Sequence, residues 1–435
     1  MKNPELNHHC DIAVIGGGAS GMAAAWYAQR TGRLQQGPAL NIALFERNDR
    51  LGKKLLSTGN GRCNLTNLDG SIGRFHGTDP SFARRALSRF PPSKVISLFE
   101  EVGLICTVEE DRKVFPASLH ASAVLDALRC ALDENDVQVH TAAKITAVAP
   151  DGNRFTLATA AGELFTASAV VIAAGGRCAP ATGSDGNGYK LASAFSHQCT
   201  CTVPAIVQLT TDTTFVKPLA GHKIRGTATL HIGGKPVREE QGEILFTDYG
   251  LSGPPILQLS GYAARAFGTA GSPASIPGIR ITLDFLPDYS LEETAALLTK
   301  RKNLFPGRKL EEYLTGLFQR RLGYALMKAS LHKPLSGSVA GLSDDEIAAL
   351  ARACKELSVA VTGTMSFAHA QTTAGGLATS SFDPSTMESR NRRGLFACGE
   401  LLDIDGDCGG FNLQWAWASG FLAGSSAVAS LAGTR

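Results

Sequence analysis

The sequence lacks any apolar run long enough to cross a membrane and any marked excess of one charge. Its 435 residues contain no stretch of about eighteen uninterrupted apolar positions, and the most hydrophobic piece, 167–174, has the length of a strand. Lysine and arginine number 42 against 39 aspartates and glutamates, a formal charge of +3. These features argue against membrane and nucleic-acid partners. The short basic cluster 390–393 is interpreted as a solvated turn, with a phosphate-binding patch as the alternative.

Paired cysteine motifs and a leader segment are also missing. The ten cysteines form no C-x-x-C pair and no zinc-like double pair, and Cys199 and Cys201, one residue apart, are poor candidates for a redox disulfide. Reduced thiols are therefore expected. The ten histidines show no metal-ligand spacing, so no metal site is expected. Residues 1–10 have no apolar core of signal-peptide type, which predicts a cytoplasmic protein.

The first glycine cluster follows directly on a short β-branched strand. Residues 11–15 have strand character, three glycines follow, and an alanine-rich amphipathic helix comes next. Gly16 permits a tight turn, Gly18 leaves room for a pyrophosphate, and Gly21 lets the helix pack closely on the strand. The phosphates then lie on the helix N-terminus. This order predicts a dinucleotide pocket rather than an ordinary glycine turn.

A second strand, residues 41–45, ends in Glu46. A carboxylate at this point accepts hydrogen bonds from ribose hydroxyls, so it favours an adenosine ribose without a phosphate. The interval from Gly21 to Glu46 is somewhat longer than usual. Residues 31–40 contain two glycines and a proline, however, and are expected to form a lengthened connection.

A second glycine-rich segment, 399–414, lies between the apolar strand 394–398 and a helix that begins near Asn412. Its glycines allow backbone N–H groups to face a ligand, and the helix start offers unpaired donors and the positive end of a dipole. Reduced flavin carries negative charge at its N1 and O2 edge, whereas reduced nicotinamide does not. The arrangement therefore predicts FAD rather than NAD as the bound cofactor.

The polar loop 52–67 follows the ribose-binding acid and is expected to line the diphosphate or the flavin ring, although asparagine and glycine also make ordinary turns. Cys63 is either close to the flavin or a small buried hydrophobe. The segment 181–189 is expected to close over the cofactor or to form a surface loop. The segment 242–254 is expected to aim substrate-contacting groups at the flavin.

The residues predicted to bind the cofactor come mainly from the two ends of the sequence, and no catalytic residue is assigned. They are Gly16, Gly18, Ala19, Ser20, Gly21, Glu46, Arg47, Lys53, Lys54, Ser57, Gly59, Asn60, Arg62, Cys63, Asn64, Ala174, Gly175, Gly399, Glu400, Asp405, Gly409, Gly410, Phe411, Asn412, Leu413 and Gln414.

The order of expected elements predicts an α/β fold in which a Rossmann-like domain, made from both ends of the chain, is interrupted by a β-rich and then helical module. The expected limits are 1–196 and 366–435 for the FAD-binding domain and 197–365 for the inserted substrate module. Helices are expected at 81–90, 93–102, 121–135, 291–298, 310–318 and 344–357, a strand meander at 137–166, and a buried parallel strand at 169–174.

Several of these segments resemble one known family. They are 14–21, 59–67, 242–254, 386–389 and 399–420. Over nearly its whole length the chain resembles the HI0933-like flavoproteins, also called the BaiN-like or aminoacetone-oxidase-like family, of the two-dinucleotide-binding-domain flavoprotein superfamily. The resemblance implies bound FAD, an oxidoreductase activity, and an inserted module that is β-barrel-like and then helical. Members commonly carry histidine where this chain has Asp248, and often aspartate in place of Asn187, so a proton-transfer role of that histidine does not carry over.

The expected function is that of an FAD-dependent oxidoreductase that passes hydride through flavin N5 to or from a small organic substrate. No second glycine fingerprint follows a strand, so NAD(P)H is expected to bind transiently, in the inserted module or at the flavin face. A reductase of an activated C=C bond and an amine oxidase that uses oxygen both remain open. A tRNA-binding or tRNA-modifying flavoprotein, against which the near-neutral charge counts, and a structural flavin in an interaction module are alternatives from other classes. The sequence carries no prediction of oligomeric state.

Overall fold

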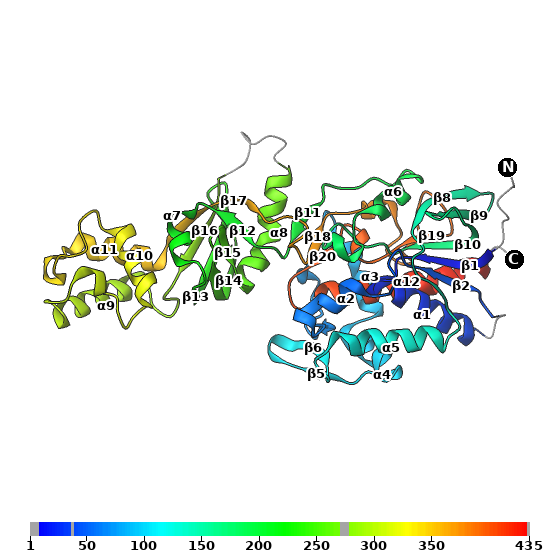
Figure 1. The fold of residues 1–435 in the computed structure, drawn as a ribbon, viewed down its shortest axis with the longest axis horizontal. Helices are drawn as coiled ribbons and strands as arrows, with labels where there is room; N and C mark the ends of the chain where they lie inside the picture. Colours follow the sequence, from blue (N-terminus) through cyan, green and yellow to red (C-terminus); the bar gives the residue numbers. More distant parts are fainter. Residues whose placement is uncertain (1–7, 36–38, 270–277, 433–435) are drawn as a thin grey trace. The chain divides into compact units, whose positions relative to one another are not determined.

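The computed structural model describes residues 8–35, 39–269 and 278–432. The chain forms two compact units (Figure 1). Unit 1 consists of Met1–Pro204 and Phe367–Arg435, and unit 2 of Ala205–Ser366. The domain ranges 1–196, 197–365 and 366–435, and the roles assigned to them in the sequence analysis, remain predictions.

The main sheet of unit 1 has the order β7-β2-β1-β10-β9-β8, with β19 beside β10. Its strands are β1 (His8–Ile15), β2 (Ile42–Phe45), β7 (Gln138–His140), β8 (Ile145–Asp151), β9 (Arg154–Thr159), β10 (Leu164–Ile172) and β19 (Leu395–Ala397). The pairs β7–β2, β2–β1, β1–β10 and β10–β19 are parallel, whereas β9 and β8 continue the sheet antiparallel. The parallel strands are rich in buried apolar residues because both of their faces are covered. Their carboxyl ends meet at one edge of the sheet, where ligands of such folds bind.

Strand β10 is a single strand where the sequence predicted two. From Leu164 to Ala167 it pairs antiparallel with β9, and from Val170 to Ile172 it pairs parallel with β19. Its other side pairs with β1 along almost its whole length. Burial alternates in the first half and becomes continuous from Ala169 onward. The prediction of a boundary between 166 and 169 was wrong because this change of pattern marks a change of neighbour, not the end of a strand.

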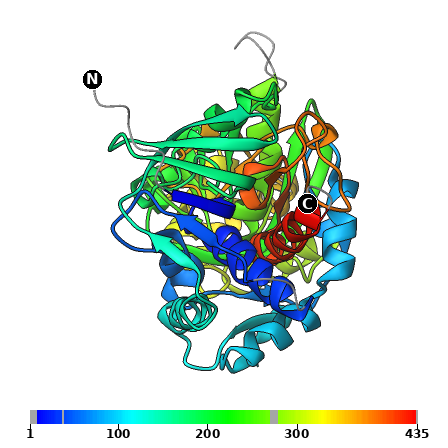
Figure 2. The ribbon, with the colours of Figure 1, turned by 90° about the vertical axis from the view of Figure 1, so that its right-hand side faces the viewer.

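Helices α1 (Ala19–Leu34) and α12 (Phe411–Ala432), near the two ends of the sequence, lie against each other. Figure 2 shows α1 in dark blue beside α12 in red. Glycines make this close approach possible: a Cβ atom on Gly420 would lie 2.5 Å from the carbonyl oxygen of Ser20, and one on Gly424 would lie 2.2 Å from that of Ala24. The end of the chain therefore supports the helix that follows the first glycine turn.

Smaller elements surround the main sheet of unit 1. They are α2 (Lys53–Ser57), β3 (Thr66–Asn67), β4 (Phe75–His76), α3 (Arg84–Arg89), α4 (Pro92–Glu101), β5 (Cys106–Val108), β6 (Lys113–Pro116), α5 (Ala121–Asp133), α6 (Asn187–Ser193), β18 (Thr372–Ala374) and β20 (Asp405–Gly406), while β11 (Val203–Ala205) ends at the first residue of unit 2. The helices expected at 93–102 and 121–135 are confirmed within two residues. The helix expected at 81–90 is a 3-10 turn (Pro80–Ala83) followed by α3, and the loop expected at 52–67 contains α2.

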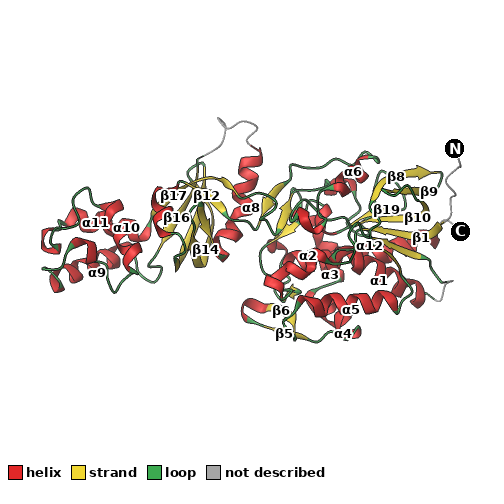
Figure 3. Ribbon diagram, in the orientation of Figure 1, coloured by secondary structure: helices red, strands yellow, loops and turns green. Residues whose placement is uncertain are grey.

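Unit 2 contains a closed barrel of strand order β12-β15-β14-β13-β16-β17. The strands are β12 (Leu209–Thr211), β13 (Lys223–Ile232), β14 (Lys235–Phe246), β15 (Gly250–Ser252), β16 (Ile279–Asp284) and β17 (Leu357–Thr364). The helices are α7 (Thr213–Val216), α8 (Pro254–Thr269), α9 (Leu291–Leu304), α10 (Arg320–Ser330) and α11 (Asp344–Lys355). Figure 3 shows α9, α10 and α11 as a red cluster next to the yellow barrel strands of this unit. The barrel-like and helical insertion implied by the family resemblance is confirmed.

The described chain has no α-helix at 310–318, where one was expected. This segment begins with a 3-10 turn, Leu310–Glu312. Leu310, Tyr313 and Leu314 are buried with helical spacing, and this spacing suggested the helix. The guanidinium of Arg301 donates to the carbonyl oxygens of Tyr313 and Thr315, at 2.9 and 2.8 Å. A side chain from α9 thus bonds backbone oxygens just after this turn.

Candidate functional site

The first glycine turn lies at the carboxyl end of β1, in the middle of the sheet edge. Gly16 has a φ of +114°, and a Cβ atom there would lie 2.4 Å from the carbonyl oxygen of Ala173, just after β10. A Cβ atom on Gly21 would lie 1.8 Å from the carbonyl oxygen of Gly16, so close packing of α1 on the turn requires glycine. Within the described residues, no heavy atom lies within 4 Å of the place that a Cβ atom would take on Gly18. The protein fills the space beside two of these glycines and leaves it open beside the third.

Glu46 follows β2 at the same edge and is only 7% exposed. Its Oε2 accepts a hydrogen bond from the backbone N–H of Gly17 at 2.8 Å. Its Oε1 accepts from the backbone N–H and the side-chain amide of Asn48, at 2.8 and 2.7 Å. These bonds hold the carboxylate beside the glycine turn. The sequence analysis missed Asn48, although asparagine is itself a common turn residue.

The segments 181–189 and 47–48 lie side by side. Arg47 forms an ion pair of 2.5 Å with Asp185, and the side-chain amide of Asn48 donates to the carbonyl oxygen of Thr182 at 2.9 Å. Burial alone would raise the pKa of Asp185, but hydrogen bonds from Arg47 and from a backbone N–H, together with the nearby positive charge, lower it below its usual value. Asn187 donates from its side chain to the carbonyl oxygen of Ile145 in β8.

The third predicted part of the sheet edge is the turn after β10. Ala174 is half-buried there, and Gly175 has a φ of +71°. A Cβ atom on Gly175 would lie 3.0 Å from the hydroxyl of Ser184. The hydroxyl of Ser184 in turn donates to the carbonyl oxygen of Gly176 at 3.0 Å. The segment 181–189 is therefore fastened to the turn at this edge as well.

The polar loop 52–67 and the glycine loop 399–414 meet at the start of α12. A Cβ atom on Gly410 would lie 2.5 Å from the carbonyl oxygen of Thr66, and the side-chain amide of Asn67 donates to the carbonyl oxygen of Gly409 at 2.9 Å. Gly409 and Gly410 have φ values of +119° and +100°, a region that favours glycine. Residues from the two ends of the sequence thus form one structure.

Side chains at the start of α12 hold this structure in place. Asn412 accepts from the N–H of Gly406 and donates to its carbonyl oxygen, both at 2.8 Å. Gln414 accepts from the hydroxyl of Thr66 at 2.6 Å and donates to the carbonyl oxygen of Phe90 at 2.7 Å. Phe411 is buried and Leu413 is half-buried against the core. The first backbone N–H groups of a helix have no partner within it, so they remain the donors that this end offers.

A buried acceptor lies beside these glycines. The Oδ1 atom of Asn64 is buried and has no hydrogen-bond partner within the described residues. It lies 2.9 Å from the place that a Cβ atom would take on Gly410. An unpaired buried acceptor is costly, and a donor from a bound molecule would satisfy this one.

Other predicted residues of the polar loop have partners within the protein. The ammonium group of Lys54 lies 2.6 Å from Glu400 Oε2, and that of Lys53 lies 2.8 Å from Asp49. Arg62 pairs with Glu109 and covers the ring of Phe115. Ser57 and Asn60 are exposed, and the hydroxyl of Ser57 donates to the carbonyl oxygen of Lys54. Gly59 has a φ of +57°, and a Cβ atom there would lie 2.8 Å from the backbone nitrogen of Asn64.

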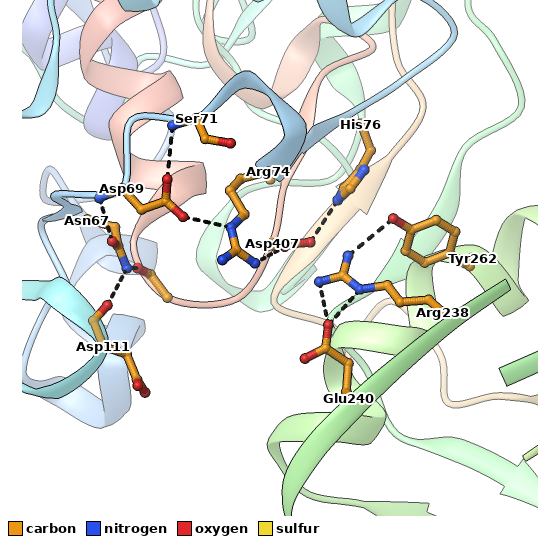
Figure 4. A network of polar contacts seen from close by, with 12 residues as sticks. Asn67, Asp69, Ser71, Arg74, His76, Asp111, Arg238, Glu240, Tyr262 and Asp407 are labelled. Atoms are coloured by element: carbon orange, nitrogen blue, oxygen red, sulfur yellow. Dashed lines mark hydrogen bonds and ion pairs between the residues drawn. The ribbon is translucent and has the colours of Figure 1, made fainter. Parts of the chain in front are cut away.

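Three residues that the site prediction missed hold the loop before α12 (Figure 4). Asp407 is buried and accepts from His76 at 2.7 Å and from Arg74 at 3.3 Å. His76 lies on β4, which pairs with β20 so that His76 faces the predicted residue Asp405, itself buried. No local pattern signals this contact, because Asp407 and its partners are far apart in the sequence.

Two buried thiols lie in the predicted site region. Burial raises the pKa of Cys63 to about 12, against a smaller lowering by a hydrogen bond with Thr58. Burial also raises the pKa of Cys398 to about 12. Both side chains are fully buried and therefore stay neutral thiols near neutral pH. The burial of Cys63 agrees with the interpretation of this residue as a small buried hydrophobe.

The site fits FAD on three observations of this structure. Open space at Gly18 suits a pyrophosphate beside the N-terminus of α1, and the carboxylate of Glu46 suits ribose hydroxyls. The unpaired oxygen of Asn64 suits an N–H of the flavin ring, beside glycines at the positive end of the α12 dipole. The described residues contain no cluster of three or more histidine, cysteine, aspartate or glutamate side chains able to hold a metal ion.

The fold and this site define a Rossmann-type flavoprotein, and comparison with known proteins gives its family. The chain matches the family described as "HI0933-like protein Rossmann domain" over residues 10–426. The chain therefore belongs to the HI0933-like family and is an FAD-dependent oxidoreductase. In the part of the chain that the structure describes, no helix is both long and apolar enough to span a membrane.

Two curated relatives align with this chain over nearly its whole length. A 3-dehydro-bile acid delta(4,6)-reductase of Clostridium scindens is 35% identical over 417 residues, which cover 96% of this chain and 98% of that protein. A ribosomal RNA dihydrouridine synthase of Escherichia coli K12 is 29% identical over 423 residues, which cover 97% and 98%. Among solved structures, a 3-ketosteroid-delta4-(5alpha)-dehydrogenase from Rhodococcus jostii RHA1 aligns over 98% of both chains with 15% identity and a TM-score of 0.46.

Proposed function

We propose that this protein takes hydride from NAD(P)H through bound FAD and delivers it, together with a proton from solvent, to a C=C bond conjugated with a carbonyl group in a small organic substrate. The observation that carries this proposal is the similarity to the 3-dehydro-bile acid delta(4,6)-reductase, at 35% identity over 96% of this chain. When bound, FAD would supply hydride transfer between a nicotinamide and the substrate through its N5 atom. The proposed substrate class follows from the 3-dehydro and delta(4,6) groups in the name of that reductase.

In this proposal the predicted residues of unit 1 hold the cofactor. The turn at Gly16, Gly18 and Gly21 binds the pyrophosphate, and Glu46 binds the adenosine ribose. The N–H groups at the start of α12, after Gly409 and Gly410, stabilise negative charge on the reduced ring without rearranging, because they are already held in place. The inserted module 197–365 supplies the substrate-binding surface.

The first test is an anaerobic stopped-flow experiment on the FAD-loaded protein. NADPH or NADH is expected to bleach the flavin absorbance rapidly, and a 3-oxo-Δ4 steroid is then expected to restore it with formation of the hydrogenated product. Bleaching by a small amine followed by rapid peroxide formation in air would instead indicate the amine oxidase. Failure of nicotinamides and amines alike to bleach the flavin would contradict both.

A second candidate substrate is a uridine in RNA. It is favoured by the ribosomal RNA dihydrouridine synthases of Escherichia coli and Haemophilus influenzae, which are 29% and 26% identical to this chain. The formal charge of +3 over 435 residues gives RNA little electrostatic attraction, which is why we place this candidate second. Incubating reduced protein with ribosomal RNA transcribed in vitro distinguishes the two. Dihydrouridine in the digested RNA, without reduction of the steroid, would replace the first proposal.

A further inference from the structure

A pocket of about 340 Å³ lies on unit 1 between two segments that are far apart in the sequence. The segment 79–85 contributes Arg84 and Arg85, at the start of α3, and the segment 379–390 contributes Arg390. Arg390 belongs to the basic cluster whose role the sequence left open between a solvated turn and a phosphate-binding patch. The proposed function assigns nothing to this pocket.

The three guanidinium groups have few partners of their own. Arg390 donates from Nε to the carbonyl oxygen of Phe382 at 3.2 Å, and this bond orients the guanidinium group. Its two terminal nitrogens make no hydrogen bond within the described residues. In the part of the chain that the structure describes, Arg84 and Arg85 make no side-chain hydrogen bond or ion pair, and both are exposed. The carboxylate of Asp79, also in the lining, already accepts from the N–H and hydroxyl of Ser81, at 3.0 and 2.6 Å.

The charged residues that line the pocket give it a positive net charge. Three arginines and one aspartate in the lining carry a formal net charge of +2. A phosphomonoester carries close to two negative charges at neutral pH, because its second pKa is about 6. A guanidinium also presents two parallel N–H donors that match phosphate oxygens, and the hydroxyl groups of Ser380 and Thr379 in the lining are further donors.

Two buried aromatic residues in the lining of the pocket strengthen these interactions. Phe82 and Phe382 line it and are 5% and 1% exposed. Buried apolar side chains in the lining lower the local dielectric constant, so a charge bound beside them is attracted more strongly than on an open surface. We propose that this pocket binds a phosphomonoester dianion. The group is carried either by a free phosphorylated small molecule or by NADPH, through its 2′-phosphate. Only the NADPH source rests on the proposed function.

The test is calorimetric titration of the FAD-loaded protein without turnover, so its outcome does not depend on reductase activity. The ligands are inorganic phosphate, NADP⁺ and NAD⁺, each at one ionic strength set with chloride. Phosphate is expected to bind, and more tightly at pH 7.5 than at pH 5.5, because the dianion forms over this range. Tighter binding of NADP⁺ than of NAD⁺ identifies the nucleotide as the source. Phosphate binding without this preference identifies a free phosphate ester.

The double variant Arg84→Gln/Arg390→Gln is expected to weaken phosphate binding at least about tenfold, since each lost hydrogen bond to a charged group is worth more than a neutral one. Arg89→Gln is the matched control: Arg89 is exposed on the same helix α3 but does not line the pocket, and its replacement should leave binding unchanged. Each variant must keep the visible spectrum of bound flavin. Phosphate that binds no better than chloride, or equal binding by the double variant, would overturn the proposal.

Discussion

The ammonium group of Lys54 lies 2.6 Å from Oε2 of Glu400, across 346 positions of sequence. The other carboxylate oxygen of Glu400 accepts from the backbone N–H of Thr373 at 2.9 Å. The ion pair thus joins helix α2 to the turn after β19, and the hydrogen bond joins that turn to strand β18. Both side chains are about three-quarters buried, at 25% and 21% exposed, so solvent screens them less than a surface pair.

A double-mutant cycle with Lys54→Met and Glu400→Gln should therefore show a coupling of about 1 kcal/mol in the free energy of unfolding. Chemical denaturation of the FAD-loaded variants measures it. The cycle Lys53→Met with Asp49→Asn is the matched control, because the Asp49 side chain is 78% exposed. That pair should show no measurable coupling, and equal coupling in the two cycles would refute the assignment.

The effect of an alanine substitution on stability should depend strongly on which glycine is replaced. Gly21→Ala places a Cβ atom 1.8 Å from a backbone oxygen of the first turn, so we expect it to lower the free energy of unfolding by at least about 2 kcal/mol. Gly341→Ala meets no described atom within 4 Å and should change stability by less than about 0.5 kcal/mol. Urea unfolding midpoints of the two variants give the comparison. Similar midpoints would mean that α1 does not pack on the turn as described.

The parts of this structure that are local in sequence could be predicted, and the parts made by distant contacts could not. Glycines between a predicted strand and a predicted helix indicated the turn at Gly16. An acidic residue at the end of a predicted strand indicated the position of Glu46. Strand β10 was divided wrongly, because the pattern of residues 164–172 responds to three neighbouring strands at once. The contact between Asp407 and His76 joins positions 331 residues apart, and no spacing rule reaches that far.

The thiol of Cys63 should stay neutral across the working pH range. Burial raises its pKa to about 12, so the flavin spectrum should show no long-wavelength thiolate charge-transfer band between pH 6 and pH 9. Absorbance at 520–600 nm along a pH titration checks this expectation, with Cys63→Ala as the reference. A band that grows with pH in the wild type and is absent from the variant would contradict the burial of this thiol.

Acid stability should depend on Asp69. The hydrogen bond from Arg74, with smaller effects of a backbone N–H and of nearby positive charges, lowers the pKa of Asp69 below its usual 3.8, despite partial burial. A carboxyl group with a lowered pKa in the folded state contributes stability above its unfolded pKa, and this contribution is lost as the pH falls through the folded value.

The wild type should therefore lose more stability on acidification below about pH 4 than Asp69→Asn does, and Arg74→Gln should flatten the acid limb in the same way. Melting temperatures measured from pH 6 to pH 2.5 give the curves. Parallel acid limbs in the wild type and both variants would show that the pair contributes nothing to stability.

The central claim is that FAD lies at the sheet edge with its pyrophosphate against Gly18, and the FAD content of Gly18→Leu tests it most directly. Gly18 has a φ of −84°, which any residue adopts, and open space where a side chain would extend, so the variant should fold. The leucine would occupy the space reserved for the pyrophosphate. We predict one FAD per chain in the purified wild type and a folded, colourless variant that takes up no added FAD. A variant that retains one FAD per chain, or a well-folded wild type that binds none, would contradict the account.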